Sequence, residues 1–222
     1  MRFAIVGEHR KVFEQNRSIH FEDLLSKTSL DKLKEGVEQT VFSKTHSPDW
    51  DSLTYPQVIQ EGKDLAFQNE ECKKIIHQKS FAELIHQLSN VKSLRYAFDQ
   101  LIVRNRKHAG CQLSGFTLKD ISQLQGTLFG LLLCIEKNGA TEETSSSLLN
   151  LKEGDGLIFQ DSVPLNLDLF AERPETYLLI VYAESKARII YRDQASPFQG
   201  FKKYGYLSGD LLRDDTHPIL IR

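Results

Sequence analysis

The spacing of apolar residues changes once along this chain, and that change limits the folds it can adopt. From about residue 22 to 138, apolar side chains recur every three to four residues, which is typical of α-helices with one buried face. After about residue 148 they alternate, which is typical of β-strands. Because helical and strand-like patterns occupy separate stretches, the sequence predicts an α+β fold rather than a doubly wound one.

The first twenty residues are expected to form a β-hairpin. Phe3 and Ile5 alternate with smaller residues, and two apolar pairs flank residues 15–18, a Gln-Asn-Arg-Ser stretch with turn composition. A short N-terminal β-hairpin is therefore predicted to precede the helices.

The central part is expected to be a block of four to five helices. The clearest one begins at Ser80, which forms a capping-box pattern with Glu83, and its apolar face continues to Ile102. Another is expected from Thr117, and its apolar residues, from Leu118 to Ile135, lie on more than one face. A helix of that kind is either the central helix of the domain or is shared with a partner subunit.

A polar segment of small residues divides the two patterns. Residues 140–147 are the predicted linker between a mainly helical domain, residues 1–140, and an antiparallel β-rich module, residues 148–222. The two can also pack as one unit. Expected strands in the module are residues 157–159, 165–169, 177–182 and 187–191.

Composition excludes several classes of protein. The formal net charge of the 222 residues is −2, so nucleic acid is not expected as the main partner. No apolar run approaches the roughly 20 residues that span a bilayer, so no membrane span is expected. Three cysteines without a CxxC pair favour reduced, buried thiols over disulfides or structural zinc. We therefore expect a cytoplasmic protein.

Two short segments resemble the PD-(D/E)xK nuclease pattern: Pro48-Asp49 and Glu61-Gly62-Lys63. In that family two carboxylates hold a divalent cation and the lysine helps to place the attacking water. The resemblance implies Mg²⁺ as cofactor and catalytic roles for Asp49, Glu61 and Lys63. However, Ser47-Pro48-Asp49 also has the composition of a helix start, so helix capping and surface charge are the competing interpretation.

One basic cluster, Arg104-Asn105-Arg106-Lys107, follows the predicted Ser80 helix. Its charge suits the negative end of a helix dipole. It could instead bind an anion, RNA or an acidic partner, so Arg104, Arg106 and Lys107 are the candidate binding residues.

Other chemical signals are missing from the sequence. The seven histidines form no HxH or HExxH pattern, and neither a GxSxG elbow nor a phosphate-binding glycine loop is present. Residues 147–155 resemble the Leu-Leu-x-Leu-x-x-Gly-Asp turn of surface-presentation domains in flagellar-switch and type III secretion proteins, and the second motif of cupins. No histidine lies between Asn150 and Asp193 to match the cupin metal ligands, so this resemblance implies a binding module.

These observations lead to two hypotheses. The first is a non-enzymatic protein–protein adaptor or structural subunit of a larger intracellular assembly, without cofactor or metal, whose partner is another subunit or a second copy of the chain. The alternative is a divalent-metal-dependent nuclease built on Asp49, Glu61 and Lys63.

Overall fold

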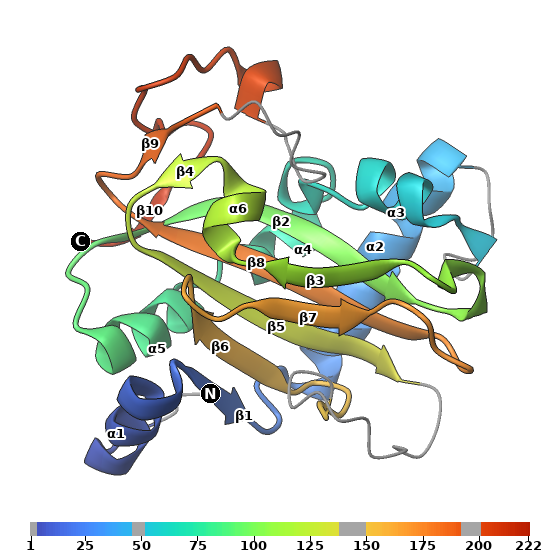
Figure 1. The fold of residues 1–222 in the computed structure, drawn as a ribbon, viewed down its shortest axis with the longest axis horizontal. Helices are drawn as coiled ribbons and strands as arrows, with labels where there is room; N and C mark the ends of the chain where they lie inside the picture. Colours follow the sequence, from blue (N-terminus) through green and yellow to red (C-terminus); the bar gives the residue numbers. More distant parts are fainter. Residues whose placement is uncertain (1–3, 46–51, 138–149, 192–200) are drawn as a thin grey trace.

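A large antiparallel sheet forms the centre of the molecule (Figure 1). The computed structural model describes residues 4–45, 52–137, 150–191 and 201–222. The sheet has six strands in the order β1-β6-β5-β8-β2-β10, so its neighbours are mostly distant in sequence. These strands are β1 (Ser18–Phe21), β2 (Leu94–Arg104), β5 (Leu128–Lys137), β6 (Gly156–Gln160), β8 (Glu175–Glu184) and β10 (Ile219–Ile221). The predicted α+β class is confirmed.

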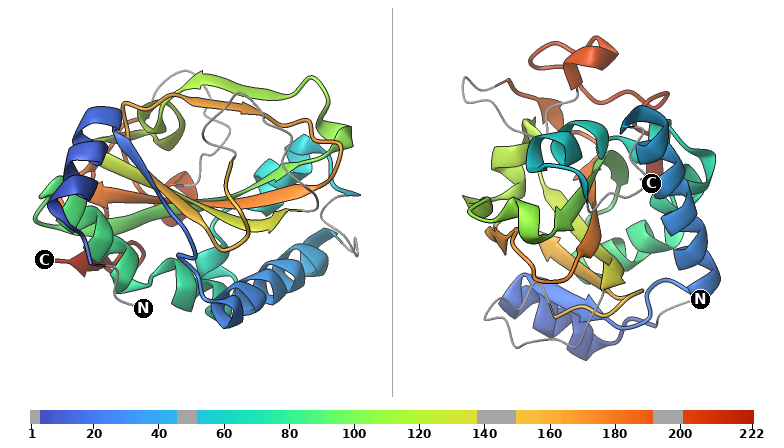
Figure 2. Two further views of the ribbon diagram at one scale, coloured as in Figure 1. Left: turned by 90° about the horizontal axis from the view of Figure 1, so that it is seen from below. Right: turned by 90° about the vertical axis from the view of Figure 1, so that its right-hand side faces the viewer.

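Two short strand pairs accompany the main sheet. Strand β3 (Gln112–Phe116) pairs with β7 (Leu165–Asp168), and β4 (Leu124–Gln125) pairs with β9 (Arg188–Ile189). The β3–β7 pair lies across one face of the main sheet, as the left view of Figure 2 shows. Between them is an apolar cluster with residues from both layers, so the two sheets enclose a common interior.

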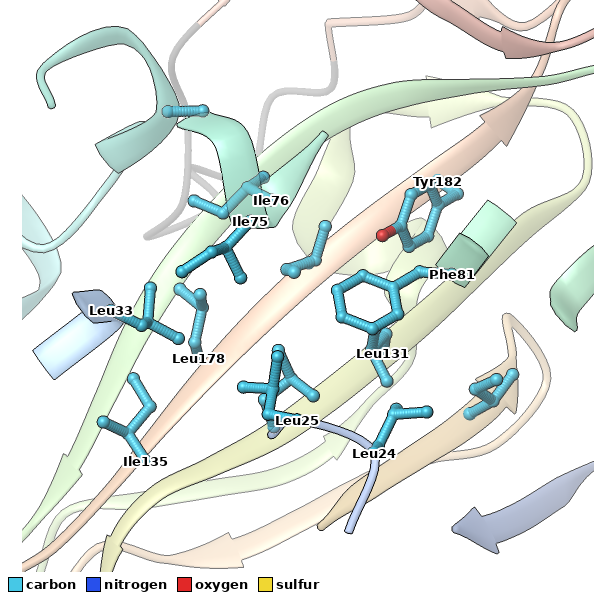
Figure 3. Packing of buried hydrophobic residues seen from close by; sticks show 14 of the residues in the cluster. Leu24, Leu25, Leu33, Ile75, Ile76, Phe81, Leu131, Ile135, Leu178 and Tyr182 are labelled. Carbon is cyan, nitrogen blue, oxygen red and sulfur yellow. The ribbon is translucent and has the colours of Figure 1, made fainter. Parts of the chain in front are cut away.

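Helices cover the opposite face of the main sheet. The covering helices are α2 (Lys27–Thr45), α4 (Glu70–Ile76) and α5 (Lys79–Ser89). Figure 3 shows Leu33 of α2, Ile75 and Ile76 of α4 and Phe81 of α5 against Leu131 and Leu178 of the sheet. The remaining helical segments are α1 (Gly7–Asn16), α3 (Tyr55–Glu61), α6 (Leu118–Ser122), η2 (Leu65–Phe67), η3 (Arg106–His108) and η5 (Phe201–Tyr204).

Because both faces of the main sheet are covered, its central strands are buried on both sides. In β8, Leu178 and Ile180 face the helices, whereas Leu179 and Val181 face the interior. Strands in this position carry nearly continuous apolar residues, without the alternation that marks a half-exposed strand. None of the described helices is both long and apolar enough to cross a membrane.

The predicted N-terminal β-hairpin is wrong. Residues 7–16 form helix α1, in which Phe13 is the buried residue, and only β1 is a strand. Strand β1 pairs with the distant β6, with Ser18 opposite Phe159. The apparent turn at residues 15–18 is the end of α1, where Arg17 adopts the left-handed conformation of a helix C-cap.

The two longest predicted helices are largely strands. The helix expected from Ser80 to Ile102 is α5, which ends at Ser89, followed by β2. The helix expected from Leu118 to Ile135 is the five-residue α6, whose Thr117–Asp120 capping box is present, followed by β4 and β5. A strand buried on both faces has the apolar density of a buried helix, so the spacing could not separate them.

The predicted domain boundary stays a prediction, because residues 140–148 lie outside the described residues. Strands from both sides of that boundary alternate within the main sheet.

Candidate functional site in the interior between the sheets

The interior between the main sheet and the β3–β7 pair is lined mostly by aliphatic side chains. The small sheet contributes Leu113, Leu165 and Leu167, all buried. The main sheet contributes the inward-facing residues of β5, β6 and β8, among them Leu132, Phe159 and Leu179. These side chains form a buried apolar cluster between the two sheets.

The buried side chain of Arg104 connects the two sheets and also forms an ion pair within the main sheet. Arg104, at the end of β2, donates from Nε to the carbonyl oxygen of Asp168 (2.6 Å) and from a terminal nitrogen to that of Phe170 (2.9 Å). Its other terminal nitrogen binds Glu175 of the adjacent strand β8. Because all three guanidinium nitrogens have protein partners, Arg104 closes the interior at this end.

Tyr177 and Cys134 extend this polar end into the interior. The Tyr177 hydroxyl donates to Oε2 of Glu175 (2.8 Å), and burial raises the pKa of Tyr177 well above its ordinary value. Cys134 lies opposite Tyr177 in the sheet, and burial raises the pKa of its thiol to about 12. Both groups are therefore protonated at neutral pH, and Cys134 is not an activated nucleophile.

Gln100 carries an unsatisfied polar atom in the same interior. It is fully buried on β2 opposite Leu179, and its amide nitrogen donates to the carbonyl oxygens of Leu101 (2.9 Å) and Val58 (3.3 Å). Its carbonyl oxygen Oε1 has no partner among the described residues. A buried acceptor without a donor is costly, so this oxygen marks a place for a water molecule or a donor group of a ligand.

Helix α3 covers one edge of the interior, and His108 helps to hold it. Tyr55 and Ile59 of α3 pack against the interior cluster. Just before α3, the carbonyl oxygen of Leu53 contacts Nε2 of His108 (3.1 Å), whose Nδ1 contacts the carbonyl oxygen of Val103 (2.9 Å). With both ring nitrogens so engaged, His108 is a structural link.

A second polar cluster lies on the helix-covered face. The buried Asp99 of β2 accepts bonds from the Tyr96 hydroxyl (2.6 Å) and from the backbone amides of Leu65 (2.6 Å) and Ala66 (3.1 Å). Burial raises its pKa to about 7 against the effect of these bonds, and the charge of nearby Asp64 raises it further. This carboxyl group is occupied in fixing η2 to the sheet.

Two histidines complete that cluster. The rings of His77 and His217 lie 4.6 Å and 6.0 Å from the Tyr96 ring, measured between centroids. Burial lowers the pKa of His77 to about 4 and that of His217 to about 3, the latter also because Arg95 is near. Both are therefore neutral at pH 7.

The residues of the nuclease pattern that the structure describes have unrelated contacts. Asp49 lies outside the described residues. Glu61 is 3.5 Å from Lys44, and Lys63 forms a β-bridge with Gln100 through its backbone. Among the described residues, Glu61 and Lys63 belong to no group of three or more His, Cys, Asp or Glu side chains that could hold a metal ion.

The three predicted binding residues, Arg104, Arg106 and Lys107, do not form one surface cluster. Arg104 is committed to the buried pair described above. Arg106 lies exposed beside Glu172 (2.7 Å), and Lys107 donates to the carbonyl oxygen of Ser52 (2.8 Å). Only Arg106 and Lys107 offer charge at the surface, and their binding role stays a prediction.

Comparisons identify the fold but not a family. No family model matches the chain, and no curated protein matches it in sequence. Among solved structures, the non-heme alpha-ketoglutarate-dependent carbocyclase SnoK from nogalamycin biosynthesis aligns with a TM-score of 0.69 at 11% identity, over 97% of this chain and 96% of SnoK. The epimerase SnoN from the same biosynthesis aligns with a TM-score of 0.65 at 13% identity, over 97% and 95%. HygX from Streptomyces hygroscopicus, with nickel and 2-oxoglutarate bound, aligns with a TM-score of 0.59 at 10% identity, over 94% and 98%.

These structures correct the functional expectations drawn from sequence. The chain has the fold of enzymes, so the interpretation as a non-enzymatic adaptor or complex subunit is wrong, and so is the nuclease alternative. The sequence led us to expect no cofactor, or Mg²⁺ in the nuclease alternative. Both expectations are wrong, because similar structures contain other metals and a cosubstrate. A SnoN structure of the same fold contains Fe³⁺, alpha ketoglutarate and nogalamycin RO, and the HygX structure contains nickel and 2-oxoglutarate.

The described residues do not fit the metal centre that such enzymes commonly use. Non-heme iron oxygenases typically bind the metal through two histidines and one carboxylate. No group of three His, Cys, Asp or Glu side chains in the described ranges could hold a metal ion. His108, at the edge of the interior, has both ring nitrogens next to backbone carbonyl oxygens. We therefore assign no reaction step to a metal.

The sequence alone does not reveal this candidate site. Gln100 lies far in sequence from Glu175 and Tyr177, and none of the three belongs to a motif. They lie on neighbouring strands only because β2 pairs with β8 in the sheet. The nearest signal was Arg104, noted for its charge rather than for its buried partner.

Proposed function

We propose that this chain is an enzyme that acts on a small organic molecule held between the main sheet and the β3–β7 pair. Its nearly complete alignment with SnoK, over 97% and 96% of the two chains, carries this proposal. Because one fold can host many reactions, the analogy supports an enzyme and leaves the reaction open.

The chemistry of the interior suits a largely apolar substrate with at least one hydrogen-bond donor. Its walls are aliphatic, and the charges of Arg104 and Glu175 neutralise each other. The unpaired Oε1 of Gln100 can accept one hydrogen bond from such a donor. Gln100 would then orient the substrate, because an unmade bond at a buried acceptor disfavours molecules without a matching donor.

Ligand binding with mapping by NMR tests this proposal. We would titrate ¹⁵N-labelled protein with 2-oxoglutarate, with and without Fe²⁺, and with phenol and anisole as a matched pair that differs in one donor. Binding in the interior should shift the amides of Ile102, Leu167 and Tyr177, and Gln100→Leu should abolish any preference for phenol over anisole. Gln39→Leu, on the exposed face of α2, is the control. If none of these compounds shifts an interior amide, the proposed site is wrong.

We also propose that the protein works in a reducing compartment such as the cytoplasm. Cys72 and Cys134 are buried and Cys111 is half-buried, and all three are free thiols. If the thiols are alkylated at the moment of cell lysis, mass spectrometry should find all three cysteines reduced. Oxidised Cys111 in that experiment would contradict the assignment.

A second copy of the chain remains the proposed protein partner, with Arg106 and Lys107 as surface charges available to it or to another acidic surface. Light scattering coupled to size-exclusion chromatography gives the mass in solution. A dimer that weakens in Arg106→Ala would support this proposal, and a monomer at all concentrations would refute it.

A further inference from the structure

We propose that the helix-covered side of the molecule carries a second binding site, for a small neutral polyhydroxy compound such as a monosaccharide or cyclitol. A cavity of about 340 Å³ lies between the segment that leads into α2 and the first turns of α5. The main sheet separates it from the interior described above, so it is independent of the proposed enzyme site. The volume is at the lower end of the roughly 300–1,000 Å³ typical of ligand sites, which suits a single-ring molecule.

The floor of this cavity is apolar. Leu24 and Leu25 contribute from the segment before α2, and Phe81 and Leu84 contribute from α5. All four are buried members of the helix-covered core, in which Figure 3 labels Leu24, Leu25 and Phe81. The carbon face of a sugar ring is apolar and can pack on such a surface.

The wall formed by α5 is polar and has unused hydrogen-bonding groups. Gln78, Ser80, Glu83 and Gln87 line the cavity, and within the described parts of the chain none of their side chains has a hydrogen-bond partner. Together they offer amide, hydroxyl and carboxylate groups, so this wall has both donors and acceptors. Several adjacent hydroxyl groups on a ligand would match this arrangement.

The opposite wall adds two hydroxyl groups that are already positioned. Oγ of Ser26 and Oγ of Ser29 lie 2.9 Å apart, and the Ser26 oxygen accepts from the Ser29 amide (3.2 Å) at the start of α2. This bonding fixes both serines at the rim.

Electrostatics favours a neutral ligand over a charged one. Helices α2 and α5 both begin at the cavity, and the partial positive charge of two helix N-termini disfavours a cation. The Glu83 carboxylate on the wall disfavours an anion. The exposed lysines that open the two helices, Lys27 and Lys79, do not line the cavity. A neutral molecule with several hydroxyl groups satisfies both constraints.

A titration followed by ¹⁵N NMR tests this site with four probes: myo-inositol and D-glucose as neutral ligands, D-glucose 6-phosphate as the anion and D-glucosamine as the cation. The amides of Ser26, Ser80 and Phe81 should shift with myo-inositol or D-glucose, with a dissociation constant on the order of 1–10 mM. The two charged probes should bind at least about tenfold more weakly.

Two variants connect the binding to the proposed groups. Ser80→Ala and Gln87→Leu should each weaken the neutral ligand about fivefold, because each removes one hydrogen-bonding group. Gln39→Leu, which lies on the exposed face of α2 away from the cavity, should bind as the wild type does. Both test positions are half-buried at the rim, and an unchanged NMR spectrum elsewhere verifies folding.

Three results would overturn the proposal: no saturable shift up to about 100 mM of either neutral probe, shifts outside the cavity, or equal or tighter binding of D-glucose 6-phosphate. Since shifts at Ile102, Leu167 and Tyr177 report the other site, failure here is distinguishable from failure of the proposed enzyme function.

Discussion

The two faces of the main sheet are equally buried but use their polar residues differently. On the helix-covered face, Asp99 binds the adjacent segment η2 and Tyr96 of its own strand, so its contacts are local in space. On the interior face, Arg104 reaches from β2 to the backbone of the opposite sheet. On the helix-covered face a polar side chain therefore fastens the segment η2 to the sheet, whereas on the interior face Arg104 fastens the second sheet to the first.

The largest expected effect comes from breaking the link between the sheets. Arg104→Met removes three polar contacts and leaves the Glu175 carboxylate buried without its cation, so the free energy of unfolding should fall by about 3–5 kcal/mol. Urea denaturation followed by circular dichroism measures this loss. A loss below about 1 kcal/mol would mean that the interior does not depend on this pair.

A smaller effect should come from adding one methyl group to each face. A Cβ on Gly130 would lie 2.3 Å from the Phe159 ring in the interior, and one on Gly156 would lie 2.4 Å from Leu24 on the helix side. Each alanine variant should lose about 1–3 kcal/mol of stability through overpacking. Gly130→Ala should also disturb ligand binding in the interior, whereas Gly156→Ala should leave it intact, and chemical-shift mapping of both variants separates the two faces.

The pH dependence of stability should belong mainly to the helix-covered face. The raised pKa of Asp99, about 7 in place of 3.8, means that the folded state holds a proton that the unfolded state has lost. Its contribution to stability therefore declines as the pH rises from about 4 to 7. The lowered pKa values of His77 and His217 act in the opposite direction, because the unfolded state takes up protons first as the pH falls below 6.5.

Asp99→Asn should consequently make stability rise more steeply with pH between about 4 and 7, because only the histidine contribution remains. Thermal unfolding at intervals across this range measures the slope, with His217→Gln as the converse variant. An unchanged slope in Asp99→Asn would show that its carboxyl group does not titrate in this range.

The smallest effect is expected at Arg106, two residues from Arg104. Its ion pair with Glu172 is exposed on both sides, at 72% and 69%, so Arg106→Ala should change stability by no more than about 0.5 kcal/mol. The same denaturation experiment gives the value. A loss approaching that of Arg104→Met would contradict the distinction between the buried and exposed arginines.

The sequence predicted the fold class and several local features, but not the arrangement of the strands. The helix start at Thr117 and the strands around residues 157–159 and 177–182 are present. The predicted Ser80–Glu83 capping box is wrong, because α5 begins at Lys79 with Gln78 as its N-cap. Strand β5 was predicted as helix because both its faces are buried, which removes the alternation that identifies a strand. The candidate site could not be predicted, since Gln100 and Tyr177 become neighbours only through the pairing of β2 with β8.

The strand order also has a consequence for how the chain is synthesised. Strand β8 lies between β5 and β2 and pairs with both along most of its length, yet it is formed by residues 175–184. Until that segment leaves the ribosome, β2 and β5 have no partner on that side and leave backbone N–H and C=O groups unpaired. Contacts of such long sequence separation also slow folding. The emerging chain should therefore need protection from aggregation during most of its translation.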